Sequence, residues 1–401
     1  MGHFVVIGAG QAGAALVAKL RGIGHAGPIT LIGDEAAPPY QRPPLSKAYL
    51  MGEMDQERLY LRSAEFYASH DITLRLHERV TAIDAAAKTV TTDRQVLHYD
   101  QLALTTGSTP RRLPGAIGGD LQGVYTVRTL QDVDKMRPEF TAGRRVVIIG
   151  GGYIGLEAAA VASKLGLDVT VAELAPRILQ RVAAPETSDH FRALHRSHGV
   201  NILEGVGLDR LLGQDRVAAA RLTDGRELPA DFVIAGVGVL PATALAEMAG
   251  LTIENGIRTD ATGRTSDPNI WSAGDCASFP WRGGRLRLES VQNAIDQAEL
   301  VAENMAGAAK DYVPSPWFWS DQFDCKLQIA GLNTGYDHIV TRGPEGEAVS
   351  FWYFRGDQLL AIDAMNDPRA YMVGKRLLET GRSVSPEVIR NPETVLKALL
   401  A

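Results

Sequence analysis

The first apolar segment of the chain reads FVVIGAGQAG over residues 4–13. Its four leading apolar residues predict a buried strand, and the residues at 14–21 after the glycines predict a helix. A second apolar run at 29–32 predicts another strand, which leads to Asp34. Strand, glycine loop, helix, strand and acid occur in this order in the units that bind dinucleotides. The segment therefore predicts a parallel α/β fold with a dinucleotide site.

Gly8, Gly10 and Gly13 have a physical reason to be glycines. They let the backbone approach a pyrophosphate, whose charge then lies at the N-terminal end of the helix. Asp34 is placed to accept a hydrogen bond from a ribose hydroxyl.

The same unit returns later in the chain. Residues 145–149 predict a strand, 150–155 (GGGYIG) a loop, 156–165 a helix and 169–172 a further strand, which Glu173 closes. One chain with two complete units is expected to bind two dinucleotides, and the economical pair is FAD with a nicotinamide cofactor. The acid at the end of the second unit favours NAD, because a carboxylate repels the 2′-phosphate of NADP.

A nearby basic residue would weaken this preference for NAD over NADP. Arg177 follows Glu173 by four residues and would partly counter its charge.

The rest of the chain predicts further strands and a change of architecture. Asp275 is expected to follow a strand and to precede a helix. From Pro314 onward tryptophans and alternating stretches predict an antiparallel sheet, and a terminal helix is expected with Asn391 as its cap. The other predicted strands are 72–80, 89–92, 102–104, 232–237, 270–273 and 349–354.

The predicted fold class is α/β, with two Rossmann-like dinucleotide-binding domains and a C-terminal α+β domain that contains an antiparallel sheet. We expect a discontinuous FAD-binding domain of residues 1–112 and 242–315, an NAD-binding domain of 113–241 and a C-terminal domain of 316–401.

Composition excludes several classes of function. The net charge of −6 gives no global basic field for nucleic acid. The two cysteines, Cys276 and Cys325, are too few for a disulfide framework or a four-cysteine metal site, and their scarcity fits a reducing compartment. We find no targeting segment and no apolar run long enough for a membrane. These observations predict a cytoplasmic protein, expected as a monomer or weak dimer.

No metal site is expected either. His190, His195 and His198 lie near Asp189, but their spacing suits no helical ligand pair, and we expect them on a solvated helix face.

Several motifs together carry a family resemblance. The chain resembles, along essentially its whole length, the flavoproteins with two dinucleotide-binding domains, and within them the ferredoxin reductases of oxygenase systems. The motifs are PYQRPPLSK at 39–47, YLR at 60–62, RTL at 128–130, GDCA at 274–277, ESVQNA at 289–294 and PWFWSDQ at 316–322. One departure is TTG at 105–107, where the family has Ala-Thr-Gly.

The resemblance implies which residues contact the cofactors. For FAD it implies Gly8, Gly10, Ala12, Gly13, Asp34, Arg42, Lys47, Val80, Arg128, Asp275, Val291 and Trp319. For the nicotinamide cofactor it implies Gly150, Gly152, Ile154, Gly155, Glu173 and Gly236.

Three residues are expected to have catalytic roles. Lys47 is expected to face the flavin and to stabilise its reduced anion. Glu157 is expected to hold the nicotinamide carboxamide and to pair with Lys47. Trp319 is expected at the flavin edge, between the ring and the surface where a redox partner docks.

The cysteines exclude thiol chemistry. The stretch 38–47, where several relatives carry a redox cysteine, has none, and Cys276 and Cys325 are expected to be packing residues.

With thiol chemistry excluded, electron transfer is the remaining type of reaction. The leading hypothesis is an NADH-dependent reductase of a [2Fe–2S] ferredoxin, in which FAD takes two electrons at once and a ferredoxin accepts one at a time. The alternatives are an NADH oxidase or small-molecule reductase, and an interaction flavoprotein similar to apoptosis-inducing factor. A local basic patch of Arg62, Lys326, Lys375 and Arg376 is expected to steer an acidic ferredoxin.

Overall fold

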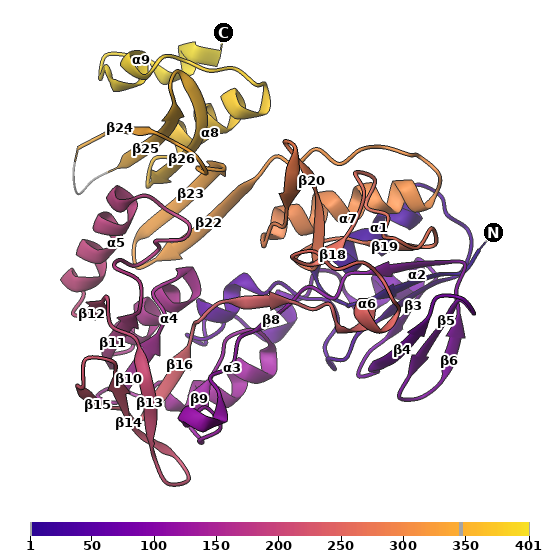
Figure 1. Cartoon of the computed structure of the whole chain (residues 1–401), viewed down its shortest axis with the longest axis horizontal. Coiled ribbons are helices and arrows are strands. Elements are labelled where there is room, and N and C mark those ends of the chain that lie inside the picture. The colour runs from indigo at the N-terminus through magenta and orange to yellow at the C-terminus, as the bar shows by residue number, and fades with distance from the viewer. Residues whose placement is uncertain (1, 345–347, 401) are drawn as a thin grey trace. The chain divides into compact units, whose positions relative to one another are not determined.

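The computed structural model describes residues 2–344 and 348–400. Its internal contacts divide the chain into two compact units (Figure 1). Unit 1 comprises the chain up to Gln41, Asp55–Thr109 and Val239–Pro316. Unit 2 comprises Arg42–Met54, Pro110–Gly238 and the chain from Trp317 onward.

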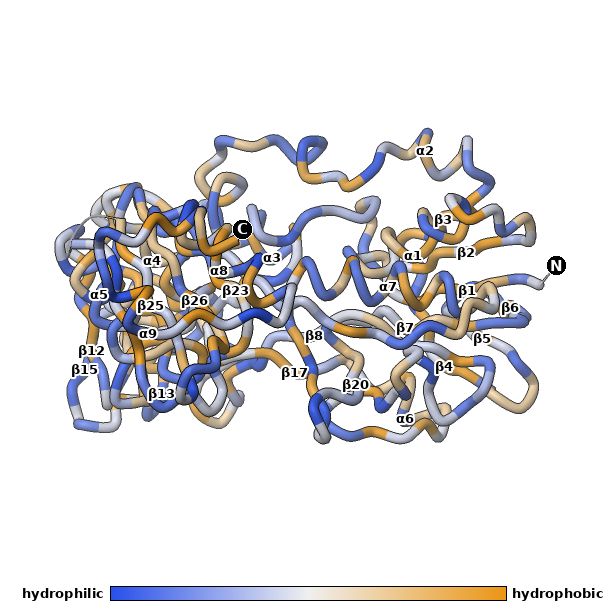
Figure 2. The backbone as a smooth tube through the Cα atoms, turned by 90° about the horizontal axis from the view of Figure 1, so that it is seen from above, coloured by the Kyte–Doolittle hydropathy of each residue, from blue (hydrophilic) through white to orange (hydrophobic). Residues whose placement is uncertain are grey.

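Unit 1 is built on a parallel five-stranded sheet in the order β19-β7-β1-β2-β3. Every residue of β1 and β2 is buried, as expected for parallel strands that are covered on both faces, and β2 is coloured as hydrophobic in Figure 2. The strands are β1 (Phe4–Ile7), β2 (Ile29–Ile32), β3 (Ile72–Arg75), β7 (Gln101–Leu104) and β19 (Ile270–Ser272).

Two helices of unit 1 lie side by side on this sheet (Figure 1). They are α1 (Gln11–Gly22) and α7 (Val291–Met305). Leu16 and Leu20 of α1 share one apolar cluster with Val301 of α7. This packing fixes α1 directly behind the first glycine loop.

The other elements of unit 1 are short. They are the 3₁₀ helix Gln56–Leu59, α2 (Ala64–Ser69), β4 (Val80–Asp84), β5 (Thr89–Thr92), β6 (Val96–His98), β8 (Ser108–Pro110), β17 (Val239–Pro241), α6 (Ala244–Met248), β18 (Ile257–Arg258), β20 (Ala277–Trp281) and β21 (Gly284–Leu286).

Unit 2 contains a second sheet of five parallel strands, in the order β12-β11-β10-β16-β9. Its strands are β9 (Val124–Tyr125), β10 (Arg145–Ile149), β11 (Asp168–Glu173), β12 (Asn201–Glu204) and β16 (Phe232–Ala235). The accompanying elements are the 3₁₀ helices Pro43–Ser46, Gly115–Ile117 and Arg137–Glu139, then α3 (Leu130–Met136), α4 (Tyr153–Lys164), α5 (Pro185–Ser197), β13 (Leu208–Gly213), β14 (Val217–Leu222) and β15 (Glu227–Pro229).

The C-terminal part of unit 2 is an antiparallel sheet in the order β22-β23-β26-β25-β24, as the sequence predicts. Strand β22 contacts α4 of the parallel part, so the two parts share one interior. The elements are β22 (Trp317–Gln322), β23 (Cys325–Gly331), β24 (His338–Arg342), β25 (Val349–Arg355), β26 (Gln358–Met365), α8 (Pro368–Glu379), α9 (Pro386–Arg390) and the 3₁₀ helix Leu396–Leu400.

Three local predictions are wrong. The stretch 72–80 is not one strand, because the chain turns at His77, where φ is 50°, between β3 and β4. Asp275 precedes strand β20 rather than a helix. Asn391 follows α9, where its side chain accepts from the backbone N–H of Glu393, and the chain ends in a 3₁₀ turn rather than an α-helix.

Candidate functional site

The first glycine loop joins β1 to α1 in unit 1. Gly8 has a φ of +110°, and a Cβ there would lie 2.3 Å from the Thr105 carbonyl oxygen. A Cβ on Gly13 would lie 2.1 Å from the Gly8 carbonyl oxygen. Gly10 differs, since a Cβ there meets nothing within 4 Å. The first and third glycines are thus required by the protein's own packing, while the second leaves open the space that a pyrophosphate needs.

The carboxyl end of β19 lies beside this loop. A Cβ on Gly274, where φ is +84°, would stand 3.1 Å from the Cβ of Ala12. The next residue, Asp275, accepts a hydrogen bond of 3.0 Å from the Ser108 hydroxyl. The structure therefore brings the GDCA motif to the first glycine loop.

The departure at Thr105 has a structural explanation. Its hydroxyl is buried and lies 3.1 Å from the carbonyl oxygen of Ile7 and 2.9 Å from that of Gly8. The hydroxyl that alanine would lack is therefore satisfied by the glycine loop itself.

The remaining predicted residues of unit 1 lie at the ends of elements. Asp34 follows β2, is exposed, and lies 3.9 Å from Arg79. Val80 begins β4. Val291 begins α7, whose cap is the Ser290 side chain.

The second glycine loop, between β10 and α4 in unit 2, repeats the geometry of the first. A Cβ on Gly150, where φ is +107°, would lie 2.4 Å from the Gly236 carbonyl oxygen. A Cβ on Gly155 would lie 2.2 Å from the Gly150 carbonyl oxygen, whereas one on Gly152 meets nothing within 4 Å. Ile154 is exposed beside that open position.

Glu173 lies at the end of β11, next to this loop. Its carboxylate accepts hydrogen bonds of 2.7 Å from the backbone N–H of Gly151 and of Ala175. Arg177, expected to counter its charge, instead donates to the Ser188 hydroxyl at 2.6 Å and the Ala183 carbonyl at 2.8 Å. The Arg177 guanidinium is therefore engaged by groups other than the Glu173 carboxylate.

Glu157 and Lys47 meet in the interior of unit 2. The Lys47 ammonium lies 2.7 Å from the carboxylate of Glu157, which is 4% exposed. Ser46 donates to the same carboxylate at 2.6 Å, as does Ser320 of β22. The expected pairing of Lys47 with Glu157 is present.

The two serines are residues that the sequence reasoning missed. Both lie inside motifs that carry the resemblance, PYQRPPLSK and PWFWSDQ. Their place in these motifs could have identified them as candidate site residues.

Arg42 and Arg128 are also brought together in unit 2, since the Arg42 guanidinium donates to the Arg128 carbonyl at 2.6 Å. Trp319 is partly buried on β22, with its ring 5.5 Å from that of Trp317.

The cysteines are free and buried, in agreement with their predicted role in packing. Burial raises the pKa of the Cys325 thiol to about 12, so it stays protonated at neutral pH.

The histidine prediction is wrong in part. His198 is exposed and His190 partly so, but His195 is fully buried, with Nε2 2.8 Å from the Gln322 side-chain oxygen.

Lys326, Lys375 and Arg376, three of the four predicted docking charges, have acidic neighbours. Lys326 lies 3.9 Å from Asp321, while Lys375 and Arg376 both pair with Glu379. Arg62 lies over the Phe66 ring.

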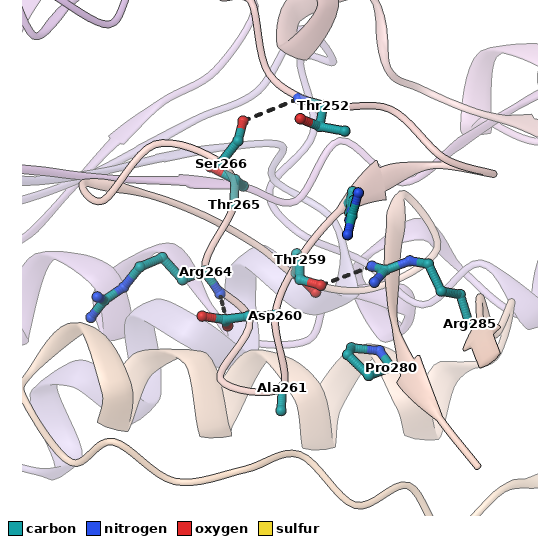
Figure 3. A pocket seen from close by; sticks show the side chains of 10 residues that line it. Thr252, Thr259, Asp260, Ala261, Arg264, Thr265, Ser266, Pro280 and Arg285 are labelled. Atoms are coloured by element: carbon teal, nitrogen blue, oxygen red, sulfur yellow. Dashed lines mark hydrogen bonds between the residues drawn. The ribbon is translucent and has the colours of Figure 1, made fainter. Parts of the chain in front are cut away.

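One pocket of unit 1 contains none of the predicted site residues (Figure 3). Its polar groups are used by the protein, since Arg285 donates to the Thr259 carbonyl at 2.8 Å and Asp260 accepts from the Arg264 backbone at 3.0 Å. We assign no cofactor to it.

Comparison with known proteins identifies the family. The family model described as pyridine nucleotide-disulphide oxidoreductase matches residues 2–298, and the model described as reductase C-terminal matches 317–400. The chain belongs to the pyridine nucleotide-disulphide oxidoreductase family. FAD and NAD are the cofactors of this oxidoreductase, and the open positions at Gly10 and Gly152 fit two such dinucleotides.

Individual relatives match over nearly the whole chain. Rhodocoxin reductase of Rhodococcus erythropolis is 42% identical, over 99% of this chain and 94% of its own. Putidaredoxin reductase CamA of Pseudomonas putida is 40% identical, over 100% and 97%. A solved covalent complex of putidaredoxin reductase with putidaredoxin matches with a TM-score of 0.96 and 39% identity, over 100% of this chain and 98% of the other.

None of the helices that the structure describes has the length and apolar character needed to cross a membrane.

Proposed function

We propose that the protein is an NADH-dependent ferredoxin reductase, which passes electrons from NADH through FAD to a [2Fe–2S] ferredoxin that supplies an oxygenase. The observation that carries the proposal is the pair of glycine loops, each with an open second glycine, in a chain whose two cysteines are free and buried. The named relatives, rhodocoxin reductase and putidaredoxin reductase, support the class of electron acceptor.

FAD is assigned to the first loop. In unit 1 we propose contacts from Gly8, Gly10, Ala12, Gly13, Asp34, Val80, Asp275 and Val291, and in unit 2 from Arg42, Lys47, Arg128 and Trp319. The helix α1 begins at the loop and presents its N-terminal backbone N–H groups, which favour an anionic pyrophosphate.

NAD is assigned to the second loop. We propose contacts from Gly150, Gly152, Ile154, Gly155, Glu173 and Gly236. The carboxylate of Glu173 retains lone pairs beyond its two backbone contacts, and these suit a ribose diol better than a phosphate.

Lys47 and Glu157 are proposed to act where the two cofactors react. When bound, FAD supplies the capacity to accept a hydride and to release electrons singly. Lys47 contributes a positive charge that stabilises negative charge on the reduced cofactor. Glu157 holds the ammonium in place at 2.7 Å and accepts from the carboxamide of the nicotinamide.

Trp319 is proposed at the edge where electrons leave, and Arg62, Lys326, Lys375 and Arg376 as charges that steer the ferredoxin. We also propose the three-domain division, with 316–401 as the docking domain, and a cytoplasmic location, which the two free cysteines support. The monomeric or weakly dimeric state stays a prediction.

The alternatives, an NADH oxidase or small-molecule reductase and an interaction flavoprotein, are not favoured by the relatives. A direct competition tests the choice. The FAD-loaded protein is given NADH with a [2Fe–2S] ferredoxin, with oxygen or with a quinone, and kcat/KM is measured for each acceptor. The ferredoxin should be the best acceptor; faster reduction of oxygen or quinone than of every ferredoxin encoded beside an oxygenase in the same genome would overturn the proposal.

A further inference from the structure

A continuous line of buried hydrogen bonds ends at Glu157. The Ser320 hydroxyl lies 2.6 Å from Glu157 Oε1, and Gln322 Nε2 lies 3.1 Å from that hydroxyl. Gln322 Oε1 in turn lies 2.8 Å from His195 Nε2. Ser320, Gln322 and His195 are all fully buried, and Glu157 nearly so. We call these four residues the Glu157 chain.

The secondary structure explains how the line is built. Ser320 and Gln322 are two residues apart on β22, so their side chains leave the same face of the strand. Helix α4 carries Glu157 and helix α5 carries His195, and the strand face reaches both. The line therefore links the parallel and antiparallel parts of unit 2.

The direction of each hydrogen bond follows from the charge at one end. An ionised carboxylate can only accept, so Ser320 must give its single proton to Glu157. The Ser320 oxygen then accepts from the amide nitrogen of Gln322, and the amide oxygen of Gln322 accepts from His195. His195 must therefore carry a proton on Nε2.

The surroundings of His195 agree with a neutral ring. Burial lowers the His195 pKa to about 4, against a smaller opposing effect of the Gln322 hydrogen bond and together with the nearby His198. The Phe323 ring packs against it in a T-shaped arrangement, with 5.0 Å between the ring centroids. A neutral imidazole has one N–H, so its tautomer decides whether it can donate to Gln322.

We propose that His195, Gln322 and Ser320 are positioning residues, which align three donors toward Glu157 and so hold its carboxylate aimed at Lys47. Hydrogen bonds in a line polarise one another, so a donor at the far end strengthens the bond that reaches the charge. The inference rests on the proposed role of Glu157 beside the cofactors. It adds a set of residues from the C-terminal part of the chain to that role.

The first test reads the tautomer without turnover. Histidine labelled with ¹⁵N is incorporated into the full-length, FAD-loaded protein, and the His195 signals are assigned by their loss in His195→Gln. We expect the neutral tautomer protonated on Nε2, unchanged between about pH 6 and 8. Protonation on Nδ1 instead would reverse the line of donors and overturn the proposal, even if the enzyme reduces ferredoxin as proposed.

The second test reads how well Glu157 is positioned. The rate constant of flavin reduction by NADH is measured by stopped flow at saturating NADH. Ser320→Ala and His195→Leu should each lower it about fivefold, because the carboxylate loses the support of a donor worth about 1 kcal/mol. His195→Gln, which retains an N–H donor, should restore most of the wild-type rate.

A matched control separates this role from simple stabilisation. Thr187→Val removes another buried hydrogen bond between α5 and the antiparallel sheet, the 2.7 Å bond from Thr187 to Asp363. It should lower the melting temperature but leave the rate constant of flavin reduction unchanged. If His195→Leu and Thr187→Val lower the rate constant equally, or His195→Gln restores none of it, the Glu157 chain is structural only and the proposal is wrong. If NADH reduces no flavin at all, the proposed function fails instead, while the NMR result still decides the direction of the line.

Discussion

Glu157 and Asp363 are both buried carboxylates of unit 2, but their partners differ. Glu157 has the Lys47 ammonium at 2.7 Å and two hydroxyl donors. Among the residues that the structure describes, Asp363 accepts from hydroxyl groups alone, those of Thr187 at 2.7 Å and of Tyr353. Hydroxyl groups offset less of the desolvation of a charge than an ammonium does. The charge of Asp363 is therefore the more poorly compensated.

Asp363 should make stability depend on pH. Burial raises its pKa from 3.8 to about 6, despite the opposing hydrogen bonds from Tyr353 and Thr187. The folded state thus holds this proton more tightly, so the stability it contributes is full below pH 3.8 and is lost as the pH rises through about 6. The complete loss amounts to about 3 kcal/mol, of which roughly half falls between pH 5 and 7.5.

The measurement is the difference in melting temperature between the wild type and Asp363→Asn at pH 5 and at pH 7.5. The melting temperature of the variant, relative to that of the wild type, should be higher at pH 7.5 than at pH 5. The same exchange at exposed Asp357 serves as the control, and an equal pH response in both variants would show that Asp363 is not the source.

Glu173 should set the choice between NADH and NADPH. In Glu173→Gln one acceptor oxygen remains for the loop, but the charge that repels a 2′-phosphate is gone. Repulsion on the order of 1–3 kcal/mol predicts that the NADH-to-NADPH ratio of kcat/KM falls about tenfold or more. Glu186→Gln, at an exposed acid of α5, should leave the ratio unchanged. A wild-type enzyme that uses both cofactors equally would refute the assignment of Glu173.

At the scale of elements, alanine substitutions in the two glycine loops should have different effects on cofactor binding and on stability. Gly10 and Gly152 have extended backbone and open space, so alanine should fold there but obstruct the pyrophosphate. Gly10→Ala should lose FAD, whereas Gly152→Ala should retain FAD and raise the Kd for NADH. Gly13→Ala should instead destabilise the fold, because its Cβ would lie 2.1 Å from the Gly8 carbonyl oxygen.

Flavin absorbance, NADH titration and melting temperature separate these outcomes. Should Gly10→Ala bind FAD normally while Gly152→Ala loses it, the cofactors would have to be exchanged between the two loops.

The sequence predicted well the elements that the glycine loops delimit. Strands 4–7, 29–32 and 145–149 have the predicted bounds, because short apolar runs next to tight turns leave little freedom in register. The prediction of a terminal helix failed because Asn391 is the C-cap of α9, and its side chain closes a turn with the backbone of Glu393.

The contacts of the candidate site were harder to predict from the sequence. The polar neighbours of His195 indicated a solvated face, but a strand that begins over a hundred residues later covers it. Likewise Lys47 and Glu157 are 110 positions apart, and only the family resemblance linked them. Local patterns carry no information about contacts at such separations.

At the scale of the whole molecule, the net charge of −6 does not favour an acidic partner, so steering must be local. Lys326 is exposed on β23 and only loosely paired, at 3.9 Å from Asp321. Lys326→Glu should slow ferredoxin reduction at low salt, with an effect that shrinks above 0.1 M, where exposed charges are screened beyond about 10 Å.

Reduction of ferricyanide should be nearly unchanged in this variant, and Lys397→Glu, at an exposed lysine outside the predicted patch, should affect neither reaction. A parallel fall of both activities in Lys326→Glu would mean that this lysine is structural and that ferredoxin docks elsewhere.

The most direct test of the whole account is an anaerobic electron balance. The FAD-loaded protein is mixed with a limiting amount of NADH and an excess of oxidised [2Fe–2S] ferredoxin, and both are followed by absorbance. A hydride carries two electrons and each cluster accepts one, so about two ferredoxins should be reduced for every NADH oxidised. A protein that oxidises NADH while the ferredoxin stays oxidised, or that reduces it only after a thiol is added, would contradict the account.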